Sequence, residues 1–272
     1  MSAFDLQDGH HIFVLDTDKD RFPEMISEKT RLIGLLAIWL LPFCGTASGG
    51  ENASNPLAAV SNTDMRWQYL KSDETSARLN DVFVDGAVMA TEKLKIKYEL
   101  HYWETNLTGR SEHDWESASV KAIYFPTEGA LESGTTYRLA TGVDYIHDFD
   151  NTDKGIGMGT DQIAPFVGVA LNLESGATII PLLQHFEGVG GGDVSITSAR
   201  VIAIQPLAER RWLKFDIRVP YDWDNEVVPA EGEIQFGDYF SESVALYLDG
   251  KFGLGSDRLY DWGVGVGIRL SY

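Results

Sequence analysis

In the stretch KLKIKYELHYW, at residues 93–103, apolar and polar side chains alternate without a break, and this pattern indicates the fold class. One set consists of Leu94, Ile96, Tyr98, Leu100 and Tyr102, and the other of Lys93, Lys95, Lys97, Glu99, His101 and Trp103. Successive side chains of a β-strand point to opposite faces, so a two-residue repeat places each set on its own face. The stretch therefore predicts a strand with one face suited to an apolar environment and one suited to water.

The same alternation returns along most of the chain, and no sustained helical periodicity follows residue 48. It continues to the last residue in WGVGVGIRLSY, at residues 262–272. Twelve strands are predicted, an even number, at residues 65–71, 81–91, 93–104, 115–125, 135–147, 161–173, 177–186, 194–206, 211–221, 230–239, 243–249 and 260–272.

The connections between these strands alternate in length. TEK, PTEGALESG, ESG, LAER and SES are mostly tight, whereas DETSARLN, TNLTGRSEHD, DNTDKGIGMGT, EGVGGGD, DWDNEVVP and DGKFGLGSDR are mostly longer. In hydrocarbon every backbone N–H and C=O must be paired, so a spanning sheet has to close on itself. Strands of about ten residues, short periplasmic turns and longer external loops are typical of bacterial transmembrane barrels. We therefore predict an all-β fold at residues 48–272, a single closed antiparallel transmembrane β-barrel of about 12 strands.

A soluble fold is the competing interpretation. Alternation also marks a half-buried antiparallel sheet in a secreted β-sandwich or an eight-stranded binding barrel. In such a protein the apolar face points inward, and the sequence by itself does not say which face does so. The terminal aromatic residue and the apolar series that leads to it from Trp262 favour the membrane version.

An export signal precedes the predicted barrel. Lys29 and Arg31 stand before the apolar run LIGLLAIWLLPF at residues 32–43, which the small-residue stretch CGTASGG follows. Twelve apolar residues are too few for a membrane-spanning helix, which needs roughly 20. We predict a signal peptide at residues 25–47, cleaved after Ala47. The acidic residues 1–24 do not suit a positively charged signal start, so we interpret them as a non-native upstream extension and Met25 as the physiological start.

The composition excludes several classes of protein. The chain of 272 residues has 41 acidic and 22 basic side chains, a net charge of −19, which argues against a nucleic-acid partner. Its 44% hydrophobic content is too high for a chain that is disordered throughout. A single cysteine, Cys44, forms neither an internal disulfide framework nor a thiolate zinc site.

Two parts of the sequence resemble known families. The terminal strand GVGVGIRLSY, ending at Tyr272, looks like the assembly signal of Gram-negative outer-membrane proteins, which implies the barrel-assembly machinery as a partner. MGTDQIAPFVGVAL at residues 158–171, IQPL at 204–207 and VVPAEGEIQFG at 227–237 are similar to the transporter barrels grouped with phenol-degradation meta-pathway outer-membrane proteins. The resemblance implies an outer-membrane barrel of presumed transport function, with no agreed substrate and no catalytic residues. The acidic leader departs from that family.

Sites for catalysis or metal binding are weakly indicated. The sequence contains no GxSxG, HExxH, CxxC or phosphate-loop motif, so we predict no enzymatic activity, no cofactor and no metal. The local candidate for an outer-membrane hydrolase is His147 with Asp148 and Asp150. Asp148, Asp150 and Asp153 resemble a calcium cluster by charge but lack the glycine and distal glutamate of the helical calcium loop, which favours a solvated acidic loop.

If the polar face is enclosed, charges of both signs line the interior. A barrel of 12 strands is narrower than the 16 to 18 strands of open porins, so these charges either form a narrow, selective path or cross-link the lumen. We predict a small-solute channel of modest conductance in the bacterial outer membrane; the alternative is a plugged structural or interaction barrel. Outer-membrane lipid and lipopolysaccharide are the expected surroundings, and the solute is unknown. The predicted pore-lining residues are Lys95, Lys97, Glu99, His101, Lys121, Arg138, Lys214, Asp216, Arg218, Glu231, Glu233 and Arg269, and the predicted interfacial anchors are Trp103, Tyr124, Trp212, Tyr221, Tyr239 and Trp262.

Overall fold

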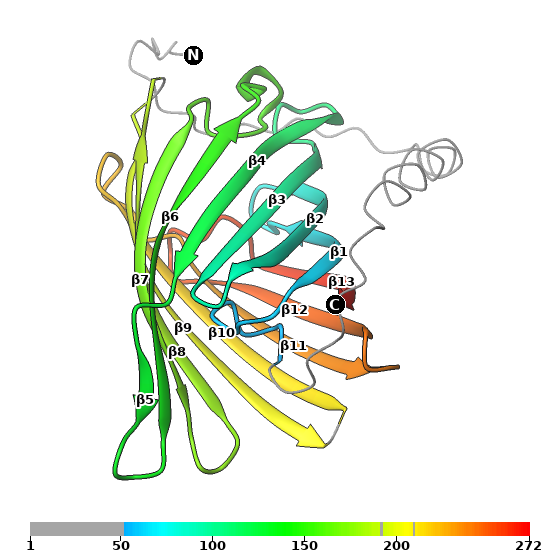
Figure 1. Cartoon of the computed structure of the whole chain (residues 1–272). Coiled ribbons are helices and arrows are strands. Elements are labelled where there is room, and N and C mark those ends of the chain that lie inside the picture. The colour runs from blue at the N-terminus through cyan, green and yellow to red at the C-terminus, as the bar shows by residue number, and fades with distance from the viewer. Residues whose placement is uncertain (1–51, 191–192, 209) are drawn as a thin grey trace, which may run out of the picture.

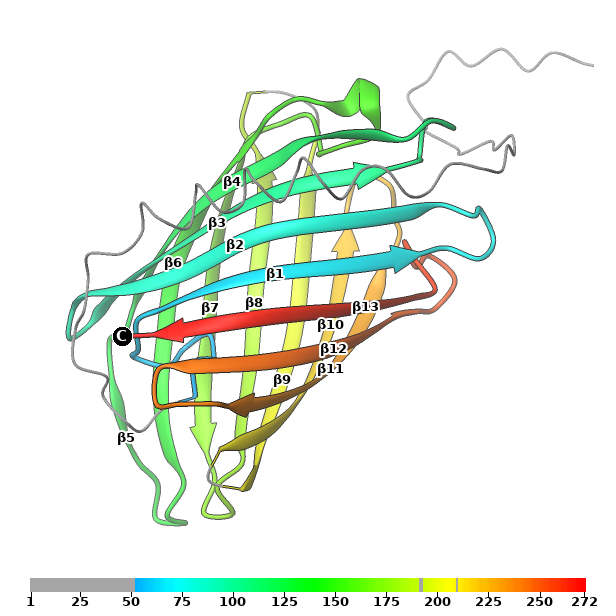
Figure 2. The same ribbon diagram turned by 90° about the vertical axis from the view of Figure 1, so that its right-hand side faces the viewer.

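The chain folds into a closed barrel of antiparallel strands around a lumen, as Figures 1 and 2 show from two sides. The computed structural model describes residues 52–190, 193–208 and 210–272. The predicted signal peptide and upstream extension lie outside these residues. The strands are β1 (Asn62–Lys71), β2 (Arg78–Thr91), β3 (Leu94–Thr105), β4 (Glu112–Tyr124), β5 (Glu128–Ala130), β6 (Thr136–Asp148), β7 (Gln162–Asn172), β8 (Thr178–Gly188), β9 (Ser195–Ala208), β10 (Arg211–Asp222), β11 (Ala230–Tyr239), β12 (Val244–Leu254) and β13 (Trp262–Ser271).

Pairing between the first and last strands closes the barrel. β1 and β13 lie side by side in Figure 2, and their register runs without interruption from Asn62↔Ser271 to Lys71↔Trp262. On the far side β4 pairs with β6, which leaves the three-residue β5 outside the ring. The prediction of a closed antiparallel barrel of 12 strands is confirmed. Its error concerns PTEGALESG, which is not a tight turn but contains β5 and extends the hairpin shown at the foot of Figure 1.

The apolar face of each strand points outward. In β13 the exposed positions are Trp262, Val264, Val266, Ile268 and Leu270, while the residues between them are buried. The same pattern holds in β10, where Phe215, Ile217 and Val219 are exposed. A soluble barrel would bury these side chains, so their exposure contradicts the soluble alternative. The outer face suits hydrocarbon and the closed ladder satisfies the backbone there.

The two rims of the barrel differ. At one rim the connections β2–β3, β7–β8, β9–β10 and β11–β12 are tight; we call it the short-turn rim. The connections at the long-loop rim are longer, and the one between β6 and β7 contains a short 3-10 helix, Thr152–Lys154. Among the described residues, no helix is long and apolar enough to span a membrane.

At several inward-facing positions of β13 the residue is glycine, so no side chain projects into the lumen there. A Cβ on Gly267 would lie 2.2 Å from the ring of Tyr247, and one on Gly265 would lie 3.1 Å from Asp249 Oδ2. Real Cβ atoms essentially never approach a neighbour to within 3.0 Å, so a side chain at position 267 would force the Tyr247 ring to shift. Side chains from β1 and β12, which flank β13, can therefore meet above it inside the lumen.

Candidate functional site: the barrel interior

The inner face has two tiers, because many strands change from apolar to charged side chains near the middle of the barrel. Toward the short-turn rim β9 presents Ile204 and Ile202, and toward the long-loop rim it presents Arg200. The neighbouring β10 presents Trp212 and then Lys214, Asp216 and Arg218. We call the two tiers the apolar chamber and the charged belt.

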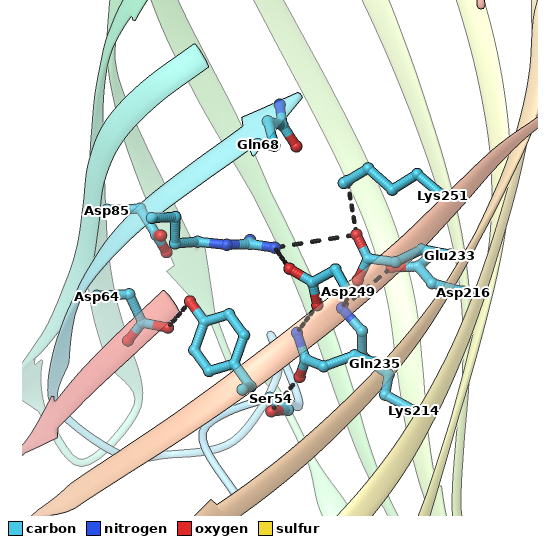
Figure 3. A network of polar contacts seen from close by, with 12 residues as sticks. Ser54, Asp64, Gln68, Asp85, Lys214, Asp216, Glu233, Gln235, Asp249 and Lys251 are labelled. Atoms are coloured by element: carbon cyan, nitrogen blue, oxygen red, sulfur yellow. Dashed lines mark hydrogen bonds and ion pairs between the residues drawn. The ribbon is translucent and has the colours of Figure 1, made fainter. Parts of the chain in front are cut away.

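Glu233 is the centre of one half of the charged belt. Its carboxylate forms ion pairs with Lys214 Nζ at 2.6 Å and with Lys251 Nζ at 2.7 Å, and Arg66 Nη2 lies 3.9 Å away. The Arg66 guanidinium also donates to Asp249 Oδ2 at 3.0 Å. Because Arg66 belongs to β1 and these carboxylates to β11 and β12, the contacts cross the glycine face of β13. Figure 3 shows Glu233, Asp249, Lys214 and Lys251 converging in the lumen.

The other half of the belt consists of shorter links between neighbouring strands. Lys121 pairs with Asp144 at 2.9 Å, and Arg200 holds Asp216 through two hydrogen bonds of 2.8 and 2.5 Å. Lys97 contacts Glu99 and lies 3.7 Å from Asp85. His101 Nδ1 lies 3.0 Å from Asp81 Oδ2, and its ring stacks on Phe83. Cations and carboxylates therefore alternate around the lumen.

The apolar chamber consists of buried side chains that form one cluster. Its side chains are almost completely buried and lie close to Trp212, which is 1% exposed and donates its indole N–H to Gln235 Oε1 at 3.0 Å. Buried apolar groups of this kind form a contiguous core. The chamber is formed by Ile123, Phe125, Ala140, Phe166, Ala170, Ile180, Ile202, Ile204, Trp212, Ala245 and Tyr247, with Leu57 among them.

Leu57 comes from a piece of chain that precedes β1 and lies inside the lumen. We call residues 52–61 the lumenal segment. Two asparagines shape it: Asn52 Oδ1 accepts Ser54 N–H, and Asn55 Oδ1 accepts Leu57 N–H, both at 2.8 Å. Such bonds make asparagine side chains effective turn formers, and Pro56 favours the same geometry. Leu57 and Ala58 at its tip are 1% and 0% exposed.

Three basic residues of the wall hold the lumenal segment. Lys95 Nζ donates to the carbonyl oxygens of Ala58, at 2.9 Å, and Pro56, at 3.3 Å. Arg138 Nη1 reaches the Leu57 carbonyl at 3.5 Å. Arg269 donates a hydrogen bond to Ser54 Oγ at 2.8 Å and further hydrogen bonds to the Asp64 carboxylate from Nε and Nη2. It therefore links the segment to Asp64 of β1. Ser54 lies beside Gln235 in Figure 3.

The twelve predicted pore-lining residues all lie at inward-facing positions, but they divide into groups. Lys95, Arg138 and Arg269 contact the lumenal segment, whereas Arg218 and Glu231, which pair at 3.3 Å, lie at the end of the charged belt toward the long-loop rim. The remaining residues, Lys97, Glu99, His101, Lys121, Lys214, Asp216 and Glu233, belong to the charged belt. Sequence reasoning missed other residues that point into the lumen and contact this belt; these are Arg66, Asp81, Asp85, Asp144, Arg200, Gln235, Asp249 and Lys251.

The predicted aromatic anchors separate into two groups. Tyr124, Tyr221 and Trp262 are exposed on the outer face, where an interfacial side chain belongs. The prediction is wrong for Trp212, which is buried in the chamber, and for Tyr239, which packs against it with a centroid distance of 4.9 Å. The alternation along β10 explains the error for Trp212. It lies two residues from Lys214, so both side chains point into the lumen. Trp103 likewise shares the inner face with His101, and its indole nitrogen is buried.

The local hydrolase candidate is divided by the barrel wall. His147 is exposed and pairs with Asp161 at 2.9 Å, while Asp148 is buried on the inner face. The Asp148 carboxylate accepts the backbone N–H groups of Asp150, at 2.7 Å, and Met158, at 2.6 Å, so it shapes the β6–β7 loop. No cluster of three or more potential metal ligands occurs in the described part of the chain.

Charged loop residues join the long-loop rim at the β1–β13 seam. Arg258 Nε donates to Asp261 Oδ1 at 2.5 Å, and Arg258 Nη2 lies 2.8 Å from Glu74 Oε1 in the β1–β2 loop. The Arg258 hydrogen bond, supported by the Asp73 N–H, lowers the pKa of the Asp261 carboxyl below its usual value. The two loops flanking the seam are therefore tied together by charge.

Comparison with known proteins identifies the fold. No family model and no curated protein matches the sequence. Among solved structures, the COG4313 outer membrane channel from Pseudomonas putida F1 is similar with a TM-score of 0.61 at 7% identity, covering 79% of this chain and 97% of that one. NanC porin gives 0.59 at 7% identity, with 77% and 100% covered, and KdgM porin gives 0.52 at 6%, with 78% and 99% covered. The chain thus has the fold of outer-membrane channel barrels, while the resemblance to the phenol-degradation meta-pathway group stays a prediction.

Proposed function

We propose that the protein is a narrow channel for small solutes in the bacterial outer membrane, with the charged belt as the water-filled part of its path. The short-turn rim faces the periplasm in this arrangement, as in other bacterial barrels. The predicted export signal, the apolar outer face and the likeness to outer-membrane channels support this location.

One observation carries the proposal. Some of the charged side chains that face inward keep substantial exposure: the side chains of Glu99 and Arg200 are each 30% exposed. The space they contact is the lumen, so the belt is not a packed core. Rings of charged side chains select ions in channels, and alternating signs in a narrow lumen are consistent with small currents. A barrel of 12 strands is intermediate between filled barrels and open porins.

A matched pair of arginines in β10 tests the channel. Arg218 faces the lumen and pairs with Glu231, whereas Arg211 faces outward and pairs with Asp238 at 3.0 Å. Their side chains are 44% and 59% exposed, so neither substitution removes a buried group. In planar bilayers with a salt gradient, Arg218→Gln is expected to shift the reversal potential toward cation preference, because it leaves Glu231 unneutralised, while Arg211→Gln leaves that potential unchanged.

The outcomes separate the channel from a scaffold. If folded wild-type protein passes no ions in bilayers and no solute in liposome swelling, the channel proposal fails. A plugged scaffold is the alternative that the lumenal segment favours. For that alternative, neutralising Lys97, Lys214 and Arg218 together would lower stability without any permeability, whereas a channel would change its ion selectivity.

A further inference from the structure

Four side chains on the outer face of the barrel form a continuous series of hydrogen bonds near the long-loop rim. His185 Nδ1 lies 3.0 Å from Thr197 Oγ1, and His185 Nε2 lies 3.2 Å from Glu187 Oε2. The Trp223 indole N–H donates to Thr197 Oγ1 at 2.9 Å. We call these four residues the outer-face cluster. In it a histidine connects a hydroxyl group to a carboxylate.

The barrel wall fixes each member of the cluster. His185 of β8 and Thr197 of β9 lie directly opposite each other in the ladder between these strands. Glu187 follows His185 by two residues, so both side chains point to the same face. Trp223 comes directly after β10, and its backbone N–H donates to the Ser195 carbonyl oxygen at 2.8 Å. The cluster is therefore held by strands rather than by a loop of its own.

The donors and acceptors of the cluster give its hydrogen bonds one direction. An indole N–H only donates, and an ionised carboxylate only accepts. A neutral His185 ring that donates from Nε2 to Glu187 accepts at Nδ1, so the Thr197 hydroxyl donates its proton to His185. A hydroxyl group whose proton points at an imidazole, with a carboxylate orienting that imidazole, is the arrangement of an activated nucleophile.

The surroundings of the cluster define its substrate. Toward the middle of the strands, the outer face next to the cluster carries the exposed side chains of Leu183 and Val201. On the other side, the Tyr221 ring packs edge-on against Trp223 with a centroid distance of 4.7 Å, and both are exposed. Such aromatic residues mark the boundary between hydrocarbon and water. An ester with an apolar acyl chain fits this place, with its chain on Leu183 and Val201 and its carbonyl group at Thr197.

We propose that Thr197 is the nucleophile and His185 the general base of a second site, which hydrolyses carboxylic esters of acylated amphiphiles in the leaflet at the long-loop rim. The Thr197 oxygen bonds to the carbonyl carbon while its proton passes to His185 Nδ1. The Trp223 N–H, already at the attacking oxygen, lies beside the anionic oxygen that forms on the same carbon. The bond to the alcohol oxygen then breaks, and the alcohol leaves with the proton.

Water completes the reaction. His185 takes a proton from a water molecule whose oxygen attacks the acyl carbon, the bond to Thr197 breaks, and the proton returns to the Thr197 oxygen as a carboxylic acid leaves. This activity goes beyond the proposed channel and departs from the sequence-based prediction of no enzymatic activity. Short motifs do not contain the set, because 12 positions separate His185 from Thr197 and 26 separate Thr197 from Trp223.

Ester hydrolysis in detergent micelles tests the site. Protein refolded from inclusion bodies, which excludes host esterases, is given p-nitrophenyl octanoate or p-nitrophenyl acetate. Wild-type protein is expected to hydrolyse the octanoate faster than the acetate. Thr197→Val and His185→Asn should each lower octanoate hydrolysis about 100-fold or more, because both remove proton transfer to the imidazole. His147→Asn is the matched control, since His147 is also exposed on the outer face and pairs with an acid, Asp161, at 2.9 Å; it should keep the wild-type rate.

A covalent probe identifies the nucleophile directly. An alkyl fluorophosphonate should phosphonylate Thr197 with loss of fluoride, as mass spectrometry of the labelled peptide shows, and should not label His185→Asn. Glu187 is a positioning residue, so Glu187→Gln should slow hydrolysis and change its pH profile, while Glu187→Asp restores part of the rate. Heat-modifiability on gels checks that each variant is folded.

Equal rates for wild-type protein and His185→Asn, an adduct on a residue other than Thr197, or acetate hydrolysis as fast as that of the octanoate would overturn the proposal. If Thr197→Val does not fold, His185→Asn and the adduct on wild-type protein carry the same test. None of these readouts depends on conduction, so the channel and the esterase stand or fall separately.

Discussion

The apolar chamber and the charged belt occupy the same lumen but are built on different physical principles. In the chamber, side chains such as Ile180 and Ala140 are fully buried and a piece of the chain completes the packing, as in a soluble core. In the belt, cations and carboxylates contact each other, and some of them, such as Glu99 and Arg200, stay partly exposed. Apolar side chains fill one tier of the lumen, whereas ion-paired side chains line the other.

Arg269 joins the two tiers, and its removal should have the largest effect. Its side chain is 7% exposed and bonds both Asp64 and Ser54. Arg269→Met leaves the Asp64 carboxylate buried without its cation, which is expected to lower the free energy of unfolding by about 3–5 kcal/mol. Urea unfolding followed by tryptophan fluorescence measures this loss. The exposed pair of Arg211 is the control, and Arg211→Met should cost at most about 1 kcal/mol. Equal losses would mean that burial does not distinguish the pairs.

The glycines of β13 are expected to have the next largest effect. Their inner face has no side chains, so side chains of β1 and β12 can meet over β13 inside the lumen. Gly267→Ala would press a methyl group into the ring of Tyr247 and is expected to cost about 1–3 kcal/mol. Gly250→Ala in β12 is the matched control, because its nearest atom outside the adjacent residues lies 4.0 Å from the added Cβ. Unfolding of both variants under identical conditions gives the difference, and a Gly267→Ala protein as stable as Gly250→Ala would contradict the steric argument.

Charges at the rim should matter least and should respond to pH and salt. The folded-state pKa of Asp261 lies below its usual value of 3.8, so its contribution to stability is present above that pH and is lost as the pH falls through the folded-state pKa. Arg258→Met removes the main cause of the shift and should flatten this acid-side dependence. Because Asp261 lies at the rim, high salt should reduce the effect. Unfolding measured across acidic pH at low and high salt tests both statements; an unchanged pH profile in Arg258→Met would contradict them.

Much of the barrel was predictable because each strand shows a two-residue alternation of apolar and polar side chains. The period of two placed every strand of the ring to within a few residues, and β3 differs from its predicted range by one residue at each end. The inward parity of Lys214 and Asp216 was also readable from their neighbours. The same alternation places Trp212 on the inner face with Lys214. The sequence therefore contained the information that Trp212 is not an interfacial anchor.

Other features left no comparable signal. NASNPLAA, at residues 52–59, reads as a polar linker with a short apolar end, and nothing local predicts that it turns back into the lumen. β5 has three residues, too few for a periodic pattern. The partners of Arg66 also depend on register, because Asp249 lies 183 positions away and meets it across another strand. The alternation of side chains therefore predicted the two faces of each strand but not which charged residues form ion pairs.

The alternation of side chains is enough to predict strands with one apolar and one polar face, and their number and connections suit a closed barrel. That information is local, since side-chain direction follows from backbone geometry at each residue. Which face is enclosed, which charges meet and what fills the chamber depend instead on how the strands assemble. Those outcomes depend on closure between β1 and β13 and on the register of every ladder, which brings together residues that no sequence interval relates.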